Sequence, residues 1–395
     1  MITMGKKGSG ISSCITAKLD KITPFYVMEL LEEARRMEAA GEDIAHMEIG
    51  EPDFSTPEPI KEAALKAILD NHTFYTESLG LPELREKIAE YYHREQGVDV
   101  SPKRIVITSG TSGAFSLVAA VLLGRNRCLV MSDPGYPCYR NFGLLAGASL
   151  VPIPVDERSR FQILPSMIEK LKRRPHLVMI ANPSNPTGTL YEPSALRALH
   201  DSIATRKGIL LVDEIYRGLT YDGEFESGVA ISDDVVVVDG FSKVFAMTGW
   251  RLGWMVVPEE LVRPVQKVLQ NVYISAPTVS QYAALAAFDT MKDVEKMKNQ
   301  YRERRAYLMS RLQDLGFQLP ALPQGAFYIY AGIQRWGMDS MVFVKRALSE
   351  ARVALTPGYD FGAYRAGGFI RFSYATDKAR LAEGCRRLAE WLPTL

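Results

Sequence analysis

Six short apolar segments between residues 104 and 257 constrain the fold more than any other feature of the sequence. They are RIVITS (104–109), CLVM (128–131), LVMIAN (177–182), GILLVD (208–213), VVVVD (235–239) and LGWMVV (252–257). Helical stretches separate them, and strands that are apolar on both faces are typical of a parallel sheet covered by helices. The sequence therefore predicts an α/β fold whose large domain, residues 55–290, is a doubly wound, mainly parallel sheet.

The two ends of the chain predict a second, smaller α+β domain. Residues 291–395 begin with a charged helical stretch and then alternate short strands, such as AFYIYA and FIRFSYA, with helices. We expect residues 21–54 to complete this domain and residues 1–20 to form a flexible arm. Residues 25–41 form an amphipathic helix whose predicted apolar face consists of Val27, Leu30, Leu31, Ala34 and Met37.

Charge and cysteine content exclude several classes of partner and location. The 47 basic and 46 acidic residues nearly cancel, leaving a net charge of +1, which predicts no nucleic-acid or membrane partner. The sequence has no apolar run of the roughly 18 residues that a membrane span needs, and no signal peptide. Its 4 cysteines form no CxxC motif, so we expect reduced thiols in a cytoplasmic protein.

Polar or aromatic residues follow five of the predicted strands. The segments are GTSGAF, SDPGYPCY, NPSNPTG, DEIY and GFSK, in chain order. Ligands of open parallel sheets bind beyond the carboxyl ends of the strands. We therefore expect these five segments to line one cleft.

Each of these motifs also has a simpler structural interpretation. Thr111 and Ser112 suit a phosphate at a helix start, but a capped helix is the alternative. Asp213 could hold a protonated ring nitrogen, or it could form a structural ion pair. Asn185 could donate its amide to a ligand, or NPSNPTG could be only a tight turn. Tyr136 is either a core residue or a plate for a planar ligand.

Lys243 also has both a functional and a structural interpretation. It lies in FSKVFAMTGWRLGW among apolar and aromatic residues, and a buried ammonium is costly unless it is paired or deprotonated. A lysine whose stem packs while its amine reaches water is the simpler interpretation.

Taken together, the motifs resemble those of the class I/II aminotransferases, which are fold-type I pyridoxal-phosphate enzymes. The resemblance runs from IGEPDF (49–54) to FIRFSYAT (369–376). It includes FYTESLGLPELR, NPSNPTG, DEIY, SKVFAMTGWRLGW, GAFY and RFSYAT. It implies the PLP-transferase fold and pyridoxal 5'-phosphate as the cofactor.

The resemblance implies a role for each matching residue. Lys243 would be the catalytic residue and form the Schiff base with the cofactor. Asp213 would pair with the ring nitrogen, Tyr216 and Asn185 would bond the ring 3-oxygen, and Tyr136 would stack on the ring. The phosphate would be held by Gly110, Thr111, Ser112, Ser242 and Arg251, and by Tyr75 acting on the partner subunit's phosphate. Arg371 would bind the substrate α-carboxylate with Asn185 and the backbone of Gly50. No metal is implied.

One position departs from the family pattern. Many relatives have a serine three residues before the lysine as a phosphate ligand, whereas this sequence has Gly240. Ser242 could compensate by supplying the phosphate contact that Gly240 lacks.

The resemblance implies an enzyme that moves the α-amino group of an amino acid to a 2-oxo acid by a ping-pong mechanism. It also implies a homodimer with shared active sites. A β-lyase or synthase reaction on the same site, or a regulatory protein that binds the cofactor, is the alternative. We see no second arginine for a distal carboxylate, which disfavours strict aspartate specificity.

Overall fold

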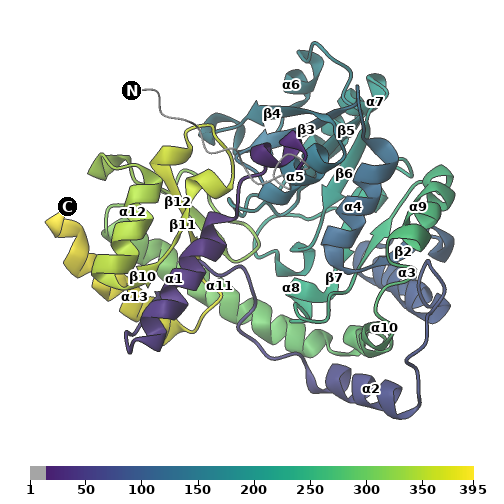
Figure 1. Ribbon diagram of the computed structural model, residues 1–395, viewed down its shortest axis with the longest axis horizontal. Coiled ribbons are helices and arrows are strands. Elements are labelled where there is room, and N and C mark those ends of the chain that lie inside the picture. The colour runs from purple at the N-terminus through teal and green to yellow at the C-terminus, as the bar shows by residue number, and fades with distance from the viewer. Residues whose placement is uncertain (1–14) are drawn as a thin grey trace, which may run out of the picture.

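The computed structural model describes residues 15–395, so most of the predicted arm, residues 1–20, lies outside the described part. Figure 1 shows two lobes. The larger lobe surrounds a central sheet, and the smaller lobe consists of helix α1 and the C-terminal part of the chain. The long helix α11 (Met291–Asp314) runs alongside both lobes. None of the helices between residues 15 and 395 is long and apolar enough to cross a membrane.

The larger lobe is built on a seven-stranded sheet in the order β2-β8-β7-β6-β5-β3-β4. All six predicted strands are present: β2 (Ile105–Thr108), β3 (Cys128–Asp133), β5 (Leu177–Ala181), β6 (Ile209–Asp213), β7 (Val236–Gly240) and β8 (Gly253–Val256). β8 runs antiparallel to both of its neighbours, and the other neighbouring strands are parallel. The mainly parallel α/β fold is therefore confirmed.

The seventh strand, β4 (Ser149–Pro154), was not predicted. It lies at the edge of the sheet, most of its residues are partly or fully exposed, and it contains two prolines. Prolines are tolerated in edge strands because an edge strand leaves one row of N–H groups unpaired. An edge strand of this kind lacks the continuous apolar run that identifies the buried strands.

The sheet is buried on both faces, as its apolar strands predict. Along β2, Ile105 and Ile107 pack into one core cluster while Val106 packs into another. The helices of this lobe are α2 (Glu58–Leu69), α3 (Pro82–Gln96), α4 (Gly110–Leu122), α5 (Pro137–Leu145), α6 (Pro165–Glu169), α7 (Pro193–Thr205), α9 (Glu259–Val272) and α10 (Thr278–Ala284). Helices α3, α4, α5 and α7 contact the sheet, whereas α6 packs on α7, α9 on α4, and α2 on α10. A short helix, α8 (Phe241–Val244), follows β7 directly.

The smaller lobe has its own core. Strands β9 (Tyr328–Gly332), β11 (Thr356–Pro357) and β12 (Phe369–Ser373) form an antiparallel sheet, and β1 (Ala45–His46) pairs with β10 (Val353–Ala354). Helices α1 (Tyr26–Ala39), α12 (Ser340–Arg346) and α13 (Lys378–Trp391) pack around these strands with α11. The domain boundaries at residues 20, 54 and 290 remain predictions.

Helix α1 does not use its predicted apolar face as one surface. Leu30 and Ala34 are buried in the core of the smaller lobe, where Met37 also packs. Val27 and Leu31 instead line a cavity of about 450 Å³ between the two lobes. The helix therefore presents apolar residues to the core and to a cavity.

Candidate active site

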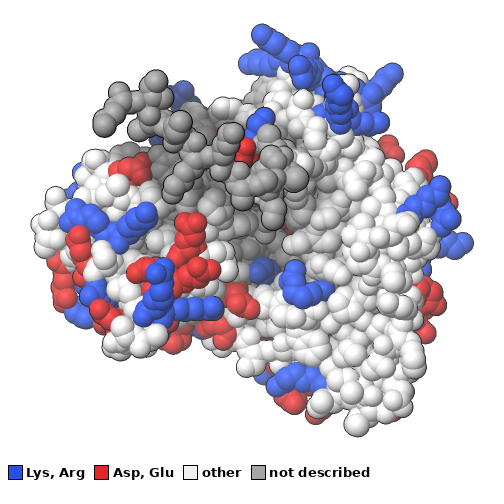
Figure 2. Space-filling model, viewed as in Figure 1, with Lys and Arg blue, Asp and Glu red and all other residues white. Residues whose placement is uncertain are grey.

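A cavity with a volume of about 450 Å³ opens between the two lobes. Figure 2 shows basic side chains in the hollow at this place. Eleven of the predicted site residues line it: Gly50, Thr111, Ser112, Tyr136, Asn185, Asp213, Tyr216, Ser242, Lys243, Arg251 and Arg371. The prediction that the five segments after β2, β3, β5, β6 and β7 share one cleft is therefore confirmed.

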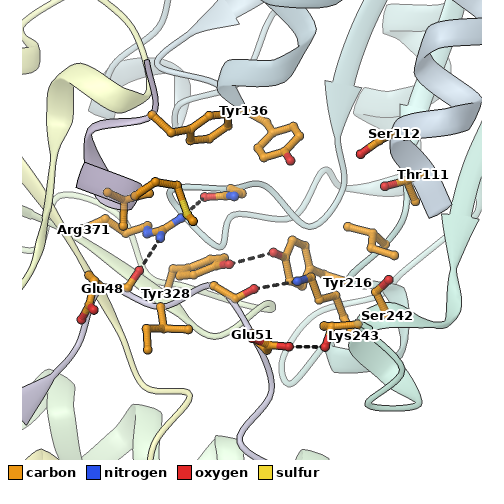
Figure 3. A pocket seen from close by; sticks show the side chains of 18 of the residues that line it. Glu48, Glu51, Thr111, Ser112, Tyr136, Tyr216, Ser242, Lys243, Tyr328 and Arg371 are labelled. Atoms are coloured by element: carbon orange, nitrogen blue, oxygen red, sulfur yellow. Dashed lines mark hydrogen bonds between the residues drawn. The ribbon is translucent and has the colours of Figure 1, made fainter. Parts of the chain in front are cut away.

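Lys243 lies in α8 and reaches the cavity from its floor (Figure 3). Its Nζ donates a 2.6 Å hydrogen bond to the backbone oxygen of Gly50. Burial lowers the pKa of Lys243 to about 8, with Arg371 and Arg251 acting in the same direction and the carboxylates of Glu51 and Asp213 opposing it. A lysine with this pKa is partly neutral near physiological pH, as a nucleophile or base must be.

Asp213 ends β6 and is almost fully buried. Its Oδ2 accepts a 2.6 Å hydrogen bond from the hydroxyl of Tyr139, and its Oδ1 accepts one from the backbone N–H of Ile215 at 3.2 Å. Burial raises the pKa of Asp213 to about 6, and these two hydrogen bonds limit the rise because they stabilise the carboxylate.

Tyr139 was not predicted as a site residue. The available signal was its position three residues after Tyr136 in SDPGYPCY. That spacing spans the first turn of α5, so both tyrosines can point towards the end of β6. The two rings are in edge-to-face contact, with centroids 5.3 Å apart.

Glycine at position 110 allows one end of the cavity to form an anion cradle. Gly110 begins α4 with a φ of 67°, and a Cβ atom there would lie 2.7 Å from Nη2 of Arg251. The guanidinium group therefore packs directly against the helix start, where Thr111 and Ser112 also line the cavity. Ser242 lines the cavity from α8 (Figure 3). A helix N-terminus, hydroxyl groups and an arginine together suit a phosphate.

Arg371 lies at the opposite end of the cavity, on β12 (Figure 3). Its Nη1 donates to Oδ1 of Asn185 at 3.0 Å, and its Nη2 donates to the backbone oxygen of Glu48 at 2.8 Å. Its guanidinium group stacks on the ring of Tyr328, 4.0 Å from the centroid. These contacts hold a planar, bidentate donor at the cavity wall.

Tyr216 and Tyr328 form a second wall. Their hydroxyl groups are 2.9 Å apart and hydrogen bonded, and both side chains are buried. Tyr328 belongs to the GAFY motif but was not predicted as a site residue. A Cβ atom on Gly50 would lie 2.6 Å from its hydroxyl, so glycine is needed there for close approach.

Two further residues, Tyr75 and Arg35, differ in where they lie relative to the cavity. Tyr75 does not line the cavity of its own chain and is 76% exposed on the loop after α2. Arg35 of α1, in contrast, lines the cavity although the sequence indicated no arginine beyond Arg251 and Arg371. The signal for Arg35 was its helical spacing from Val27 and Leu31.

The chain is similar to known proteins over nearly its whole length. The profile of the family "Aminotransferase class I and II" matches residues 42–388. The chain is 37% identical to the valine–pyruvate aminotransferase of Mycobacterium tuberculosis over 377 residues, which is 94% of this chain and 97% of that protein. It is 35% identical to an aspartate aminotransferase of Pyrococcus horikoshii over 373 residues, 93% and 94% of the two chains.

A solved structure is also similar. The crystal structure of an aminotransferase from Mycobacterium tuberculosis superposes with a TM-score of 0.94 at 36% sequence identity, covering 96% of this chain and 99% of that chain. The recognition of the family from its motifs is confirmed. The chain belongs to the class I and II aminotransferases, enzymes that depend on pyridoxal phosphate and act on amino acids and 2-oxo acids.

Proposed function

We propose that Lys243, Asp213 and the Gly110–Arg251 cradle hold pyridoxal 5'-phosphate in the cavity for the aminotransferase reaction. The observation that carries this proposal is that an amine, a carboxylate and an anion cradle converge on one cavity. The bound cofactor supplies a carbonyl carbon that bonds to amines and a ring that withdraws electrons.

The donor set suits the cofactor at each end. Arg251, Thr111, Ser112 and the N-terminus of α4 would bind the phosphate, with Ser242 beside them. At the other end of the ring, Asp213 would accept a hydrogen bond from the protonated ring nitrogen. Its carboxylate is buried and has no cationic side chain bonded to it in the described part of the chain, so a bound cation would stabilise its charge. Tyr136 would cover one face of the ring.

Asn185 and Tyr216 would bind the ring 3-oxygen. Asn185 Oδ1 accepts from Arg371, which leaves its Nδ2 group to donate into the cavity. The Tyr216 hydroxyl is oriented by Tyr328. Asn185 would therefore connect the cofactor to the group that binds substrate.

Arg371 would bind the α-carboxylate of the amino acid, because its fork matches a carboxylate and its contacts to Asn185 and Glu48 fix its plane. Lys243 Nζ would take the proton from the substrate Cα and later return it, since its lowered pKa of about 8 permits both states near neutral pH. The ping-pong order of the two half-reactions is general for the family.

We also propose a homodimer in which Tyr75 completes the partner subunit's phosphate site. Tyr75 is exposed, and so are apolar side chains on α2, the following loop and the end of α9: Leu65, Ile68, Leu69, Phe74 and Val272. Monomeric proteins rarely expose many large apolar side chains together, so we propose that a second copy of the chain covers these residues.

We propose a cytoplasmic location as well. The three described cysteines, Cys128, Cys138 and Cys385, are free, which supports this location.

Two measurements test the proposed function. Borohydride reduction of the protein with pyridoxal phosphate, followed by peptide mapping, should place the cofactor on Lys243. Label on a different lysine would contradict the assignment. A screen of donors carrying nitrogen-15 should transfer the label to pyruvate or 2-oxoglutarate. Release of the label as ammonia without transfer would instead favour the β-lyase alternative.

A further inference from the structure

One face of α1 forms a wall of the cavity. Val27, Met28, Leu31 and Arg35 line the cavity, whereas Leu30 and Ala34 are buried in the core of the smaller lobe. Val27, Leu31 and Arg35 are spaced four residues apart, so they form a row along the helix about 12 Å long. An apolar strip therefore leads to a guanidinium group.

Three arginines line the cavity: Arg251, Arg371 and Arg35. Arg251 packs against the start of α4 and donates to the backbone oxygen of Thr248, and Arg371 bonds Asn185 and Glu48. Arg35, in contrast, makes no hydrogen bond or ion pair with any residue between 15 and 395. It is the cavity arginine that no side chain or backbone group of the described chain holds in place.

The acidic side chains on the cavity wall do not neutralise Arg35. Glu48 directs its carboxylate to Nδ1 of His46 at 2.7 Å, and Glu51 is hydrogen bonded to the hydroxyl of Thr248. The Asp213 carboxylate is bonded to Tyr139. The guanidinium group of Arg35 is therefore available to a bound anion.

We propose that Arg35 binds the distal carboxylate of a dicarboxylic substrate, so that at least one of the two substrates is a dicarboxylic amino acid or 2-oxo acid. This inference rests on the proposed function, which assigns Arg251 to the phosphate and Arg371 to the α-carboxylate. Three guanidinium groups then match three anionic groups. The methylene chain of the substrate lies against Val27 and Leu31, and its terminal carboxylate receives a bidentate contact from Arg35.

The neighbouring residue provides a matched control. Arg36 lies on the same helix but is paired with Glu33 at 2.6 Å, and it lines a separate groove on the far side of α1 from the cavity. Arg36→Gln removes the same charge from the same helix without altering the cavity. Any effect of net charge or helix stability should appear in both variants.

The test is binding of two unreactive acids of equal length to the enzyme loaded with pyridoxal phosphate. Glutarate carries two carboxylates and valerate carries one. Their dissociation constants are measured by calorimetry at about 0.15 M salt, where long-range charge effects are screened. We expect the wild type and Arg36→Gln to prefer glutarate about 10–100-fold, and Arg35→Gln to lose most of this preference. Arg35→Lys should retain part of it, because it keeps the charge but not the fork.

Two results would overturn the inference: equal binding of the two acids by the wild type, or an unchanged preference for glutarate in Arg35→Gln. Either would show that Arg35 is only a solvated residue at the rim of the cavity. The proposed function is tested separately by the donor screen with labelled nitrogen in the wild type, which includes donors with and without a distal carboxylate. Failure of nitrogen transfer from every donor would contradict the proposed function whatever the glutarate result.

Discussion

The hydroxyl of Tyr139 donates a 2.6 Å hydrogen bond to Oδ2 of Asp213, inside a site where both side chains are almost fully buried. This contact joins the start of α5 to the end of β6, 74 residues apart in sequence. It opposes the effect of burial, which alone would raise the pKa of Asp213 further above its ordinary value. Tyr139 is thus a positioning residue for the carboxylate proposed to bind the cofactor ring.

Tyr139→Phe should weaken binding of pyridoxal phosphate by about tenfold at pH 7, because a hydrogen bond to a charged group contributes about 1.5–3 kcal/mol. The pKa of Asp213 should rise, so affinity should start to fall at a higher pH than in the wild type as the solution is acidified. Cofactor titrations between pH 6 and pH 8 measure both effects. Tyr191→Phe is the control, because it removes a buried hydroxyl whose hydrogen bonds within residues 15–395 are both to the backbone of Ile163. Equal loss in both variants would contradict a specific role for Tyr139.

Replacement of Lys243 by methionine should stabilise the cofactor-free protein. The pKa of Lys243 is lowered to about 8 from its ordinary 10.5, so the folded state binds fewer protons than the unfolded state between these two values. The free energy that folding loses by burying the charged amine of Lys243 is therefore fully present below pH 8. This loss disappears as the pH rises towards 10.5.

We expect Lys243→Met to gain about 1–3 kcal/mol at pH 7, since each pKa unit is worth 1.36 kcal/mol and the lost bond to Gly50 offsets part of the gain. Urea unfolding at pH 7 and pH 10 should show the gain shrinking at the higher pH. Lys296→Met, at an exposed lysine of α11, should show no such dependence. A gain that is constant with pH would indicate better packing instead of a removed charge.

Gly110→Ala should damage cofactor binding more than stability. The added Cβ would meet Arg251 at 2.7 Å and displace the guanidinium group from the phosphate cradle. Gly97→Ala is a matched control, since Gly97 has a similar φ of 64° with nothing within 4 Å of the added atom. Both changes should cost about 1 kcal/mol of stability, from left-handed strain. Only Gly110→Ala should lower pyridoxal phosphate affinity, by at least about tenfold in equilibrium dialysis.

The proposed shared site can be tested by mixing two defective chains, Lys243→Ala and Tyr75→Phe, at limiting pyridoxal phosphate. If Tyr75 acts on the partner subunit, one site of each hybrid dimer combines an intact Lys243 with an intact Tyr75. Mixed samples should then show sites with wild-type cofactor affinity that neither parent has. Activity equal to the parental average, with hybrids confirmed by native mass spectrometry, would mean that Tyr75 acts within its own chain.

The sequence alone determined the architecture of the larger lobe and the residues that follow its strands. Runs such as VVVVD and GILLVD are apolar at successive positions, and only a strand buried on both faces uses such a run. Since parallel strands end at one edge of a sheet, Asp213 and Lys243 could be placed near each other without a structure. Strand β4, with prolines and a partly exposed edge, lacked this signal.

Tertiary structure alone decided which neighbours complete the site. Tyr139 contacts Asp213 across 74 residues and Tyr328 contacts Tyr216 across 112, and no local pattern encodes which distant side chains meet. Helix α1 gives the clearest case. Its periodicity indicates which residues share a side of the helix, but what covers each side depends on how the two lobes pack. That packing buries Leu30 and Ala34 in a core and places Val27, Leu31 and Arg35 beside the cavity.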